Sequence, residues 1–204
     1  HVGNTVDPWS VLNTQGADAV RWFFYNNAAP WMPNRFHAKA IDETTRKYMG
    51  TLWNTYAFFI LYAEIDQFNP KEHPLDKAEL TLMDRWILSR LNSLVREVDD
   101  DLNEYKIFEA SRAMTDFVDD LSNWYVRRSR ERFWGKGMAG DKEAAFATLY
   151  HVLETMSRLT APFTPFMAEN MYRNLVCSVD KDAPISVHMT DFPTCNEKYI
   201  NTEL

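Results

Sequence analysis

The chain has 204 residues, of which 46% are hydrophobic, 14% aromatic and 25% charged. This composition excludes an intrinsically disordered chain, and the length is sufficient for a sizeable hydrophobic core. The formal net charge is −7, with 22 Lys and Arg against 29 Asp and Glu, so any contact with nucleic acid has to be local rather than a property of the whole surface.

Several other classes are excluded by what the sequence lacks. Apolar runs are all interrupted by charges and none reaches membrane-spanning length. The start, HVGNTVDPW, has neither an initiator Met nor a signal-peptide stretch, so we expect a piece of a longer cytoplasmic protein. Cys177 and Cys195 have no neighbour at zinc-ligand spacing and are expected to be free thiols. Without an HExxH motif, a phosphate loop or a nucleophile elbow, no catalytic or metal-binding residue is expected.

Long segments without glycine predict helices, because only six glycines occur and three of them cluster at positions 135, 137 and 140. A short helix is expected over Ala17 to Asn26, before the breaks at Pro30 and Pro33. Hydrophobic residues at three- and four-residue spacing predict longer helices over about 36–65, 81–102, 108–133 and 141–161, and a fifth from Pro165.

Capping residues support these boundaries. Thr81 and Asp84 resemble a capping box, and Asp141 is expected to be the N-cap of its helix. Thr164 is expected to cap the helix that begins with Pro165. The resulting fold class is an all-α helical bundle with a short irregular or β-like C-terminal tail, in which ISVHM (Ile185 to Met189) is a candidate strand.

The segment LSNWYVRRSRERFW, Leu121 to Trp134, carries the strongest functional signal. Four arginines stand among aromatic residues, and RNA binding uses both kinds: guanidinium forks pair with phosphates, and flat rings stack on unpaired bases. The candidate RNA-binding residues are Arg127, Arg128, Arg130, Arg132, Phe133 and Trp134.

Helical spacing sorts these residues by face. The inward stripe of Phe117, Leu121 and Trp124 continues onto Arg128 and Arg132, so Trp124 is expected to anchor the helix in the core. A plainer interpretation stays open: arginines in the last turns of a helix match its dipole, and Asp99, Asp100 and Asp101 on the preceding helix are available as partners. The ring of Trp134 either stacks on RNA or packs back on the bundle.

Weaker candidates have plain structural explanations. Trp53 lies on the hydrophobic stripe of the first long helix and is expected to pack in the core. Arg46 and Lys47 on that helix are ordinary surface cations. The acidic run from Val98 to Glu104 would repel a phosphate backbone, so it is expected to face away from RNA.

With these motifs in place, the sequence resembles a known family. GNTVDPWSVLNTQGADAVRWFF (Gly3 to Phe24) is similar to the segment after the KMSK-type loop of class I aminoacyl-tRNA synthetases, with matches at Gly3, Asn4, Asp7, Pro8, Gly16, Ala17, Asp18, Ala19 and Arg21. Further segments resemble isoleucyl-tRNA synthetases in particular, and the resemblance covers nearly the whole chain. They are APWMPNRF, GTLWNTYAFFILYAEIDQF, DRWILSRLNSLV, FVDDLSNWYVRRSRERFW, LTAPFTPFMAENMY and SVHMTDFP.

The resemblance implies three segments in this chain, and it implies that catalysis takes place in other parts of the parent enzyme. Residues 1–36 would be a stem-contact-like segment that follows the KMSK loop, 37–180 the helical anticodon-binding domain, and 181–204 a C-terminal tail. The parent enzyme would ligate isoleucine to tRNA(Ile) with ATP and Mg, whereas this chain, lacking the catalytic core, would have no cofactor and no adenylation activity. Its implied partners are tRNA(Ile) and the upstream catalytic and editing domains of the same polypeptide, with no membrane.

Two alternatives remain at this point. The helical bundle could be a protein-interaction scaffold, in which the arginine segment docks an acidic partner. The match could also reflect the equivalent module of the valine or leucine enzyme, which shares the general helix pattern.

Overall fold

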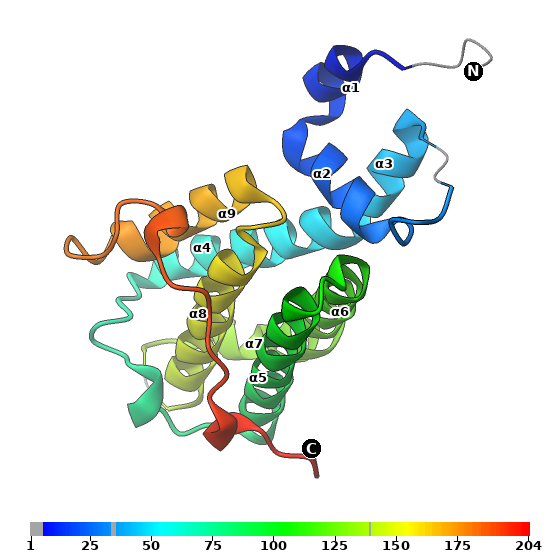
Figure 1. The fold of residues 1–204 in the computed structure, drawn as a ribbon. Coiled ribbons are helices and arrows are strands. Elements are labelled where there is room, and N and C mark those ends of the chain that lie inside the picture. Colours follow the sequence, from blue (N-terminus) through cyan, green and yellow to red (C-terminus); the bar gives the residue numbers. More distant parts are fainter. Residues whose placement is uncertain (1–5, 34–35, 139) are drawn as a thin grey trace.

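A computed structural model describes residues 6–33, 36–138 and 140–204. Throughout these ranges the regular structure is helical, as Figure 1 shows. The α-helices are α1 Pro8–Gln15, α2 Ala17–Asn26, α3 Ala38–Thr45, α4 Thr51–Asp66, α5 Leu82–Asn103, α6 Ile107–Asp119, α7 Arg127–Trp134, α8 Asp141–Thr160 and α9 Pro165–Tyr172. The predicted all-α bundle is therefore confirmed. Gly3 and Asn4 of the entry motif lie outside the described residues.

Wider π-helical turns join several of these helices without a break. The turn Arg46–Gly50 links α3 to α4, so the helix expected over 36–65 is one run from Ala38 to Asp66. The turn Asp120–Val126 links α6 to α7 in the same way, and the helix expected over 108–133 runs from Ile107 to Trp134.

The caps follow the sequence in part. Thr81 and Asp84 form the predicted capping box at the start of α5. Asp141 is not an N-cap: it is the first residue of α8, and Gly140 takes the cap position with a φ of 57°. Thr164 does precede Pro165, but its hydroxyl hydrogen-bonds Thr160 at 2.8 Å and caps no backbone N–H.

The strand predicted over Ile185 to Met189 is wrong. Val187–Met189 form a single 3₁₀ turn, and no strand occurs in the described ranges. Glu169 accepts the backbone N–H of Val187 at 2.9 Å, and Ser186 accepts that of His188 at 3.2 Å. Because side chains satisfy these donors, the segment needs no neighbouring strand.

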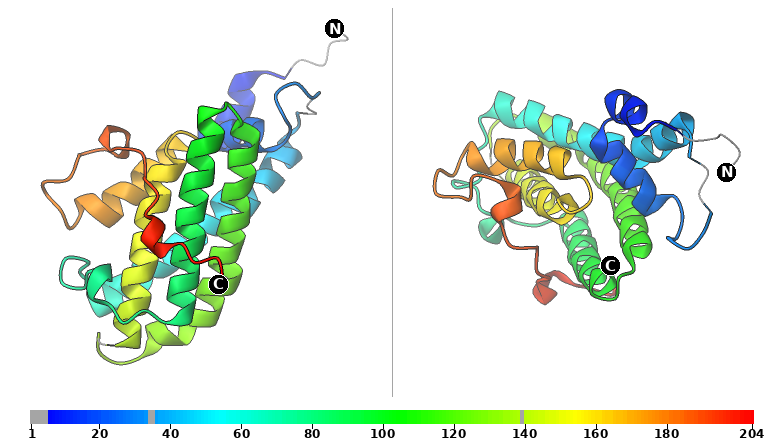
Figure 2. Two further views of the ribbon diagram at one scale, coloured as in Figure 1. Left: turned by 60° about the horizontal axis from the view of Figure 1, so that its bottom comes forward. Right: turned by 45° about the horizontal axis from the view of Figure 1, so that its top comes forward.

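The main core lies between α4, α5, α6 and α8. In Figure 2 α5, α6 and α8 lie side by side, and α4 crosses them. A second, smaller cluster forms between α1, α2 and α3 from Val11, Ala19, Phe23 and Ile41. These three helices stand off from one end of the bundle in Figure 1. The C-terminal tail returns along α5, where Asn92 accepts the N–H of Asn196 and Ser89 that of Asn201.

Two charged residues of α2 join the N-terminal helices to the bundle at the turn between α8 and α9. Asp18 accepts the N–H groups of Met167 at 2.8 Å and Phe166 at 3.4 Å, and so caps α9 from another helix. Arg21 donates to the carbonyl oxygens of Pro162 at 2.7 Å and Phe163 at 3.2 Å. Each charge has the sign that the helix end beside it favours.

Gly16 sets the start of α2, which carries both of these charges. Its φ of 85° lies in a region that residues with a Cβ rarely adopt, so the tight junction between α1 and α2 requires glycine. The motif around Gly16, Asp18 and Arg21 thereby has a structural explanation, which is to hold α2 against the α8–α9 turn.

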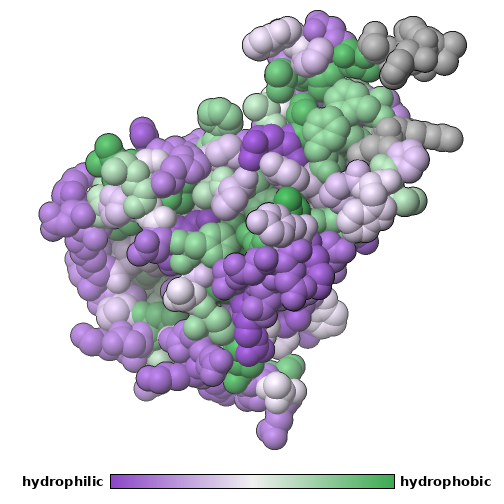
Figure 3. All heavy atoms as spheres, viewed as in Figure 1, coloured by the Kyte–Doolittle hydropathy of each residue, from purple (hydrophilic) through white to green (hydrophobic). Residues whose placement is uncertain are grey.

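The surface is divided by hydropathy. Figure 3 shows hydrophobic residues gathered over the N-terminal helices and hydrophilic residues over much of the remaining face. In this N-terminal region four large hydrophobic residues are more than half exposed: Trp9, Phe24, Trp31 and Met32.

On α4, Trp53 is 39% exposed, so the expectation that it packs in the core is wrong. Helix α4 is apolar on all sides, and its periodicity therefore did not identify its outer face.

Removal of the Asp18 cap should destabilise the whole fold. Asp18→Ala leaves the N–H groups of Phe166 and Met167 without an acceptor, and we expect the free energy of unfolding to fall by about 1–2 kcal/mol. Urea unfolding followed by circular dichroism measures the loss. The matched control is Asp7→Ala, because Asp7 caps α1 at the exposed end of the molecule and should contribute only about 0.5 kcal/mol. Equal losses in the two variants would show that the interhelix cap has no special role.

Candidate nucleic-acid interface

The π-helical turn Asp120–Val126 decides which side chains of the arginine segment face outward. An extra residue in this turn shifts every later position around the helix axis relative to a regular 3.6-residue repeat. Tyr125 rather than Trp124 therefore continues the buried stripe, and Trp124 is 48% exposed. The prediction that Trp124 is a core anchor is wrong for this reason. The buried stripe continues through Ser129 and Phe133, at four-residue spacing.

The carboxylate of Asp84 lies at the centre of the network behind this segment. It is completely buried and accepts five hydrogen bonds. Two come from the backbone and hydroxyl of Thr81, at 2.9 and 2.7 Å. The Tyr125 hydroxyl donates a third at 2.6 Å, and Arg132 donates two through its fork, at 2.7 and 2.8 Å.

Arg132 also ties α7 to the start of α8. Its Nε donates to the Asp141 carboxylate at 2.7 Å, and Nη2 donates to the Asp141 carbonyl oxygen at 3.1 Å. Only 13% of the Arg132 side chain is exposed. The guanidinium is thus committed to two carboxylates, which corrects the expectation that Arg132 contacts phosphate.

Asp84 and Arg132 stabilise each other's charged forms. Burial alone would raise the pKa of Asp84, but hydrogen bonds from Arg132, Tyr125 and Thr81 outweigh it and hold the pKa below its usual value. Burial alone would lower the pKa of Arg132, whereas its contacts with Asp84 raise it overall. Burial and the Asp84 charge raise the pKa of Tyr125 well above its usual range. The carboxylate is therefore ionised and the phenol neutral at physiological pH.

Phe133 belongs to the core and not to the surface. It is 1% exposed, and its ring centroid lies 5.2 Å from that of Phe58 and 4.9 Å from that of Phe146. A ring enclosed in this way has no free face for a base. The expectation that Phe133 stacks on RNA is therefore corrected: it anchors α7 against α4 and α8.

Arg127, Arg128 and Arg130 are the arginines that remain exposed. In the part of the chain that the structure describes, none of the three forms an ion pair, and Asp99 to Asp101 do not reach them. The guanidinium of Arg128 lies 4.4 Å from the ring centroid of Trp124, and that of Arg130 lies 5.9 Å from the ring of Phe58. Their charges are therefore available to an anion from outside.

Trp134 is held at the surface in a fixed position. Its ring is 57% exposed, and its indole N–H donates to the Tyr62 hydroxyl at 2.9 Å. Because the only polar group of the ring is already bonded, the exposed part offers an aromatic face. Arg127, Arg130 and Trp134 follow one another at three- and four-residue spacing, so they share one side of α7.

Tyr62 and Phe58 of α4 were not among the residues singled out from the sequence, although both support this face. Helix α4 is hydrophobic nearly throughout, and nothing in its pattern distinguishes the turn beside α7. Asp84 carried a signal as part of the capping box, but its second role as partner of Arg132 depends on a contact 48 residues away in the chain.

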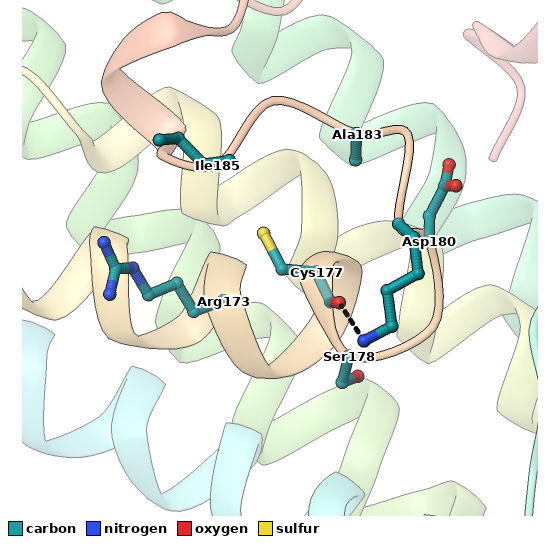
Figure 4. Close-up of a pocket in the computed structure, with 7 residues that line it drawn as sticks. Arg173, Cys177, Ser178, Asp180, Ala183 and Ile185 are labelled. Carbon is teal, nitrogen blue, oxygen red and sulfur yellow. Dashed lines mark hydrogen bonds between the residues drawn. The ribbon is translucent and has the colours of Figure 1, made fainter.

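A shallow depression of about 440 Å³ lies beside Arg173, Cys177 and Lys181, and Figure 4 shows Arg173, Cys177 and Asp180 around it. The Lys181 ammonium donates to the Cys177 carbonyl oxygen at 3.5 Å. Both cysteines are free thiols, as predicted. Within the described residues, no group of three His, Cys, Asp or Glu side chains could hold a metal ion, and no helix is long and apolar enough to cross a membrane.

Comparison with known proteins identifies the class. Residues 84–204 match the family model described as the anticodon-binding domain of tRNA ligase. The match covers more than half of the chain, which therefore belongs to this family.

Curated proteins similar to this chain include several that are named isoleucine–tRNA ligase. The chain is 52% identical to that of Clostridium novyi (strain NT) over 99% of its length, 50% identical to that of Clostridium acetobutylicum over 100%, and 48% identical to that of Bacteroides fragilis over 100%. It covers 19%, 20% and 18% of these proteins respectively, so it spans about a fifth of their length.

A solved structure shares the fold. The chain matches the Agrobacterium radiobacter K84 agnB2 LeuRS in its ternary complex with tRNA and LeuAMS, with a TM-score of 0.70. The match covers 98% of this chain and 23% of that one, at 21% identity.

Breaking the buried ion pair should cost much more stability than removing an exposed arginine. Arg132→Met leaves the Asp84 charge buried without its main partner, and we expect the free energy of unfolding to fall by about 3–5 kcal/mol. The control is Arg127→Met, an exposed arginine five residues earlier, for which a change within about 0.5 kcal/mol is expected. Chemical denaturation measures both. Similar small effects would mean that the Arg132 contacts do not hold α7 in place.

The same network predicts an acid-sensitive step in stability. The pKa of Asp84 is lower in the folded chain than in the unfolded chain, where it is about 3.9, so protons bind preferentially to the unfolded chain. The stabilisation is complete above about pH 4 and is lost as the pH falls through the folded-state pKa. Unfolding free energies of the wild type and Asp84→Asn, measured from pH 6 down to pH 2.5, should converge as the pH falls. A constant difference across this range would contradict the assignment.

Proposed function

We propose that this chain is the tRNA(Ile) anticodon-stem-loop binding module of an isoleucine–tRNA ligase. The family match and the names of the relatives at 48–52% identity support this assignment. The whole protein ligates isoleucine to tRNA(Ile) with ATP, works in the cytoplasm, and carries its catalytic and editing chemistry on other domains of the same polypeptide. This chain supplies the docking of tRNA.

The proposal keeps the division inferred from the sequence. Residues 1–36 form the stem-contact-like segment, 37–180 the anticodon-binding domain and 181–204 the tail. We assign ATP and Mg²⁺ to the rest of the parent enzyme, and no chemical step is assigned to this chain.

The observation that supports the proposal most strongly is that the arginines between Leu121 and Trp134 have two different environments. Arg132 is only 13% exposed and is paired with Asp84 and Asp141, whereas Arg127, Arg128 and Arg130 are exposed and form no ion pair within the described residues. In a chain with seven more acidic than basic residues, three neighbouring cations without carboxylate partners make a local positive face. Such a face binds phosphate oxygens through charge-assisted hydrogen bonds.

Trp134 complements these cations. Phosphate contacts position a nucleic acid, and a stacked ring adds affinity for an unpaired base. An anticodon loop provides both groups at close range, since its phosphates run beside bases that are not paired. Rigid support from Tyr62, Phe133 and the Asp84–Arg132 pair holds the face in shape before RNA arrives, which lowers the entropic cost of binding.

In the whole enzyme the contribution of this module is orientation. Holding the anticodon stem-loop fixes where the acceptor end of the same tRNA lies relative to a distant catalytic domain. The joint made by Asp18 and Arg21 serves this role, because it holds the N-terminal helices in one position on the bundle.

A salt titration of tRNA binding tests the proposal. Three engaged arginines predict that log affinity falls with log salt concentration with a slope of about −2, from about −0.7 per single-stranded phosphate neutralised. Fluorescence anisotropy with labelled tRNA(Ile) measures the slope. The double variant Arg127→Ala/Arg130→Ala should reduce it to about −0.7, and Arg46→Ala, an exposed arginine on another helix, is the matched control.

The outcome separates this function from its alternatives. A flat salt response, or unchanged affinity in the double variant, would favour a protein-interaction scaffold. Competition with purified tRNA(Val) and tRNA(Leu) tests the identity of the tRNA, and stronger binding of either one would reassign the module.

A further inference from the structure

We infer that Trp124 and Arg128 form a second stacking platform, which takes an unpaired nucleobase of the RNA bound by the neighbouring arginines. The inference rests on the proposed function and adds to it a binding element separate from Trp134. Trp124 lies ten residues before Trp134, so the two rings stand at opposite ends of the arginine segment, separated by about 15 Å along the helix axis.

The first observation is the exposure of the Trp124 ring. Nearly half of this large apolar side chain, 48%, is in contact with solvent, although a regular helix would turn the position inward. The π-helical turn Asp120–Val126 puts Tyr125 in the core instead and leaves Trp124 outside. Such turns are frequent at functional sites, because they redirect side chains without ending the helix.

The second observation is the position of the Arg128 guanidinium. It lies 4.4 Å from the Trp124 ring centroid, one helical turn further along, at a distance typical of a cation over an aromatic face. A guanidinium placed over a ring can take part in stacking with a base, while its N–H groups reach a phosphate. The pair therefore combines both chemistries of single-strand recognition.

The third observation is that no carboxylate pairs with Arg128 in the described residues: Glu131, three residues later, forms no ion pair with it, and two carboxylates before Trp124 have other partners. Asp120, four residues before Trp124, accepts two hydrogen bonds from Arg90, at 2.8 and 3.1 Å. Asp119 accepts one from Asn123 at 2.7 Å. Arg128 consequently keeps its charge available, although the helix around it is rich in acidic residues.

A purely structural role for the pair is the competing explanation. A cation over an exposed ring stabilises a helix modestly by itself, and such a role requires nothing of RNA. The two explanations differ in what Trp124→Ala changes: a structural contact affects only unfolding, whereas a stacking platform affects RNA affinity in a chain that stays folded.

The test is binding of a fluorescein-labelled anticodon stem-loop RNA of tRNA(Ile) to variants of the full chain. We expect Trp124→Ala to weaken binding about 5- to 150-fold, the loss of one stacked base. Its salt dependence should equal that of the wild type, because a neutral ring displaces no counterion. Trp124→Phe should restore most of the affinity, and Arg128→Ala should reduce the salt slope by about 0.7.

Two controls make the result specific. Phe166→Ala removes a more exposed aromatic ring, 71% accessible, from α9 and should leave binding unchanged. Trp134→Ala and Arg127→Ala/Arg130→Ala report on the proposed function itself. Circular dichroism and the urea midpoint confirm that each variant is folded.

The failures are distinguishable. Wild-type affinity in Trp124→Ala, together with weaker binding in Trp134→Ala or the double arginine variant, would overturn the second platform and leave the anticodon-binding function in place. Wild-type affinity in all of these variants, or no binding of the RNA by the wild type, would overturn both.

Discussion

The bidentate pair between Arg132 and Asp84 is the interaction on which the arginine segment depends. It joins α7 to the first turn of α5, and Asp141 extends it to α8, so three helices meet at one guanidinium. Because this one arginine is turned inward, the register of α7 is fixed and the others face solvent. A buried ion pair contributes little net stability against an apolar substitute, but it penalises every alternative packing that leaves either charge unpaired. We propose that the pair serves mainly to fix one packing of α7 against α5 and α8.

Much of the fold could be predicted from the sequence, because long helices with few glycines leave a clear period. The runs ending near Asp66, Asn103 and Trp134 were expected within a few residues. The faces were harder. A π-helical turn between Asp120 and Val126 changes the phase of the helix. No local residue preference in this segment predicts such a turn. Two assignments in and after that turn were therefore wrong: Trp124 was expected inside and Phe133 outside, while the structure has the reverse.

The candidate site illustrates a second limit. In a sequence, arginines that form ion pairs inside the protein cannot be distinguished from arginines that remain available to a ligand. Arg132 and Arg130 stand two positions apart with the same chemistry, yet one is neutralised by Asp84 and the other lies over the ring of Phe58. The difference is made by partners 48 and 72 residues distant in the chain, and such contacts follow from tertiary packing rather than from spacing.

The acidity of the whole chain adds a final constraint. With a net charge of −7, the long-range field repels RNA, so affinity has to arise within about a Debye length of the surface, roughly 8–10 Å in physiological salt. Phosphates that approach α7 meet three unpaired guanidinium groups there, whereas the carboxylates closest to Trp124 already have partners in Arg90 and Asn123. On the function proposed above, such a face would select places where phosphates and unpaired bases are presented together. That combination is what a structured loop of tRNA offers and a uniform duplex does not.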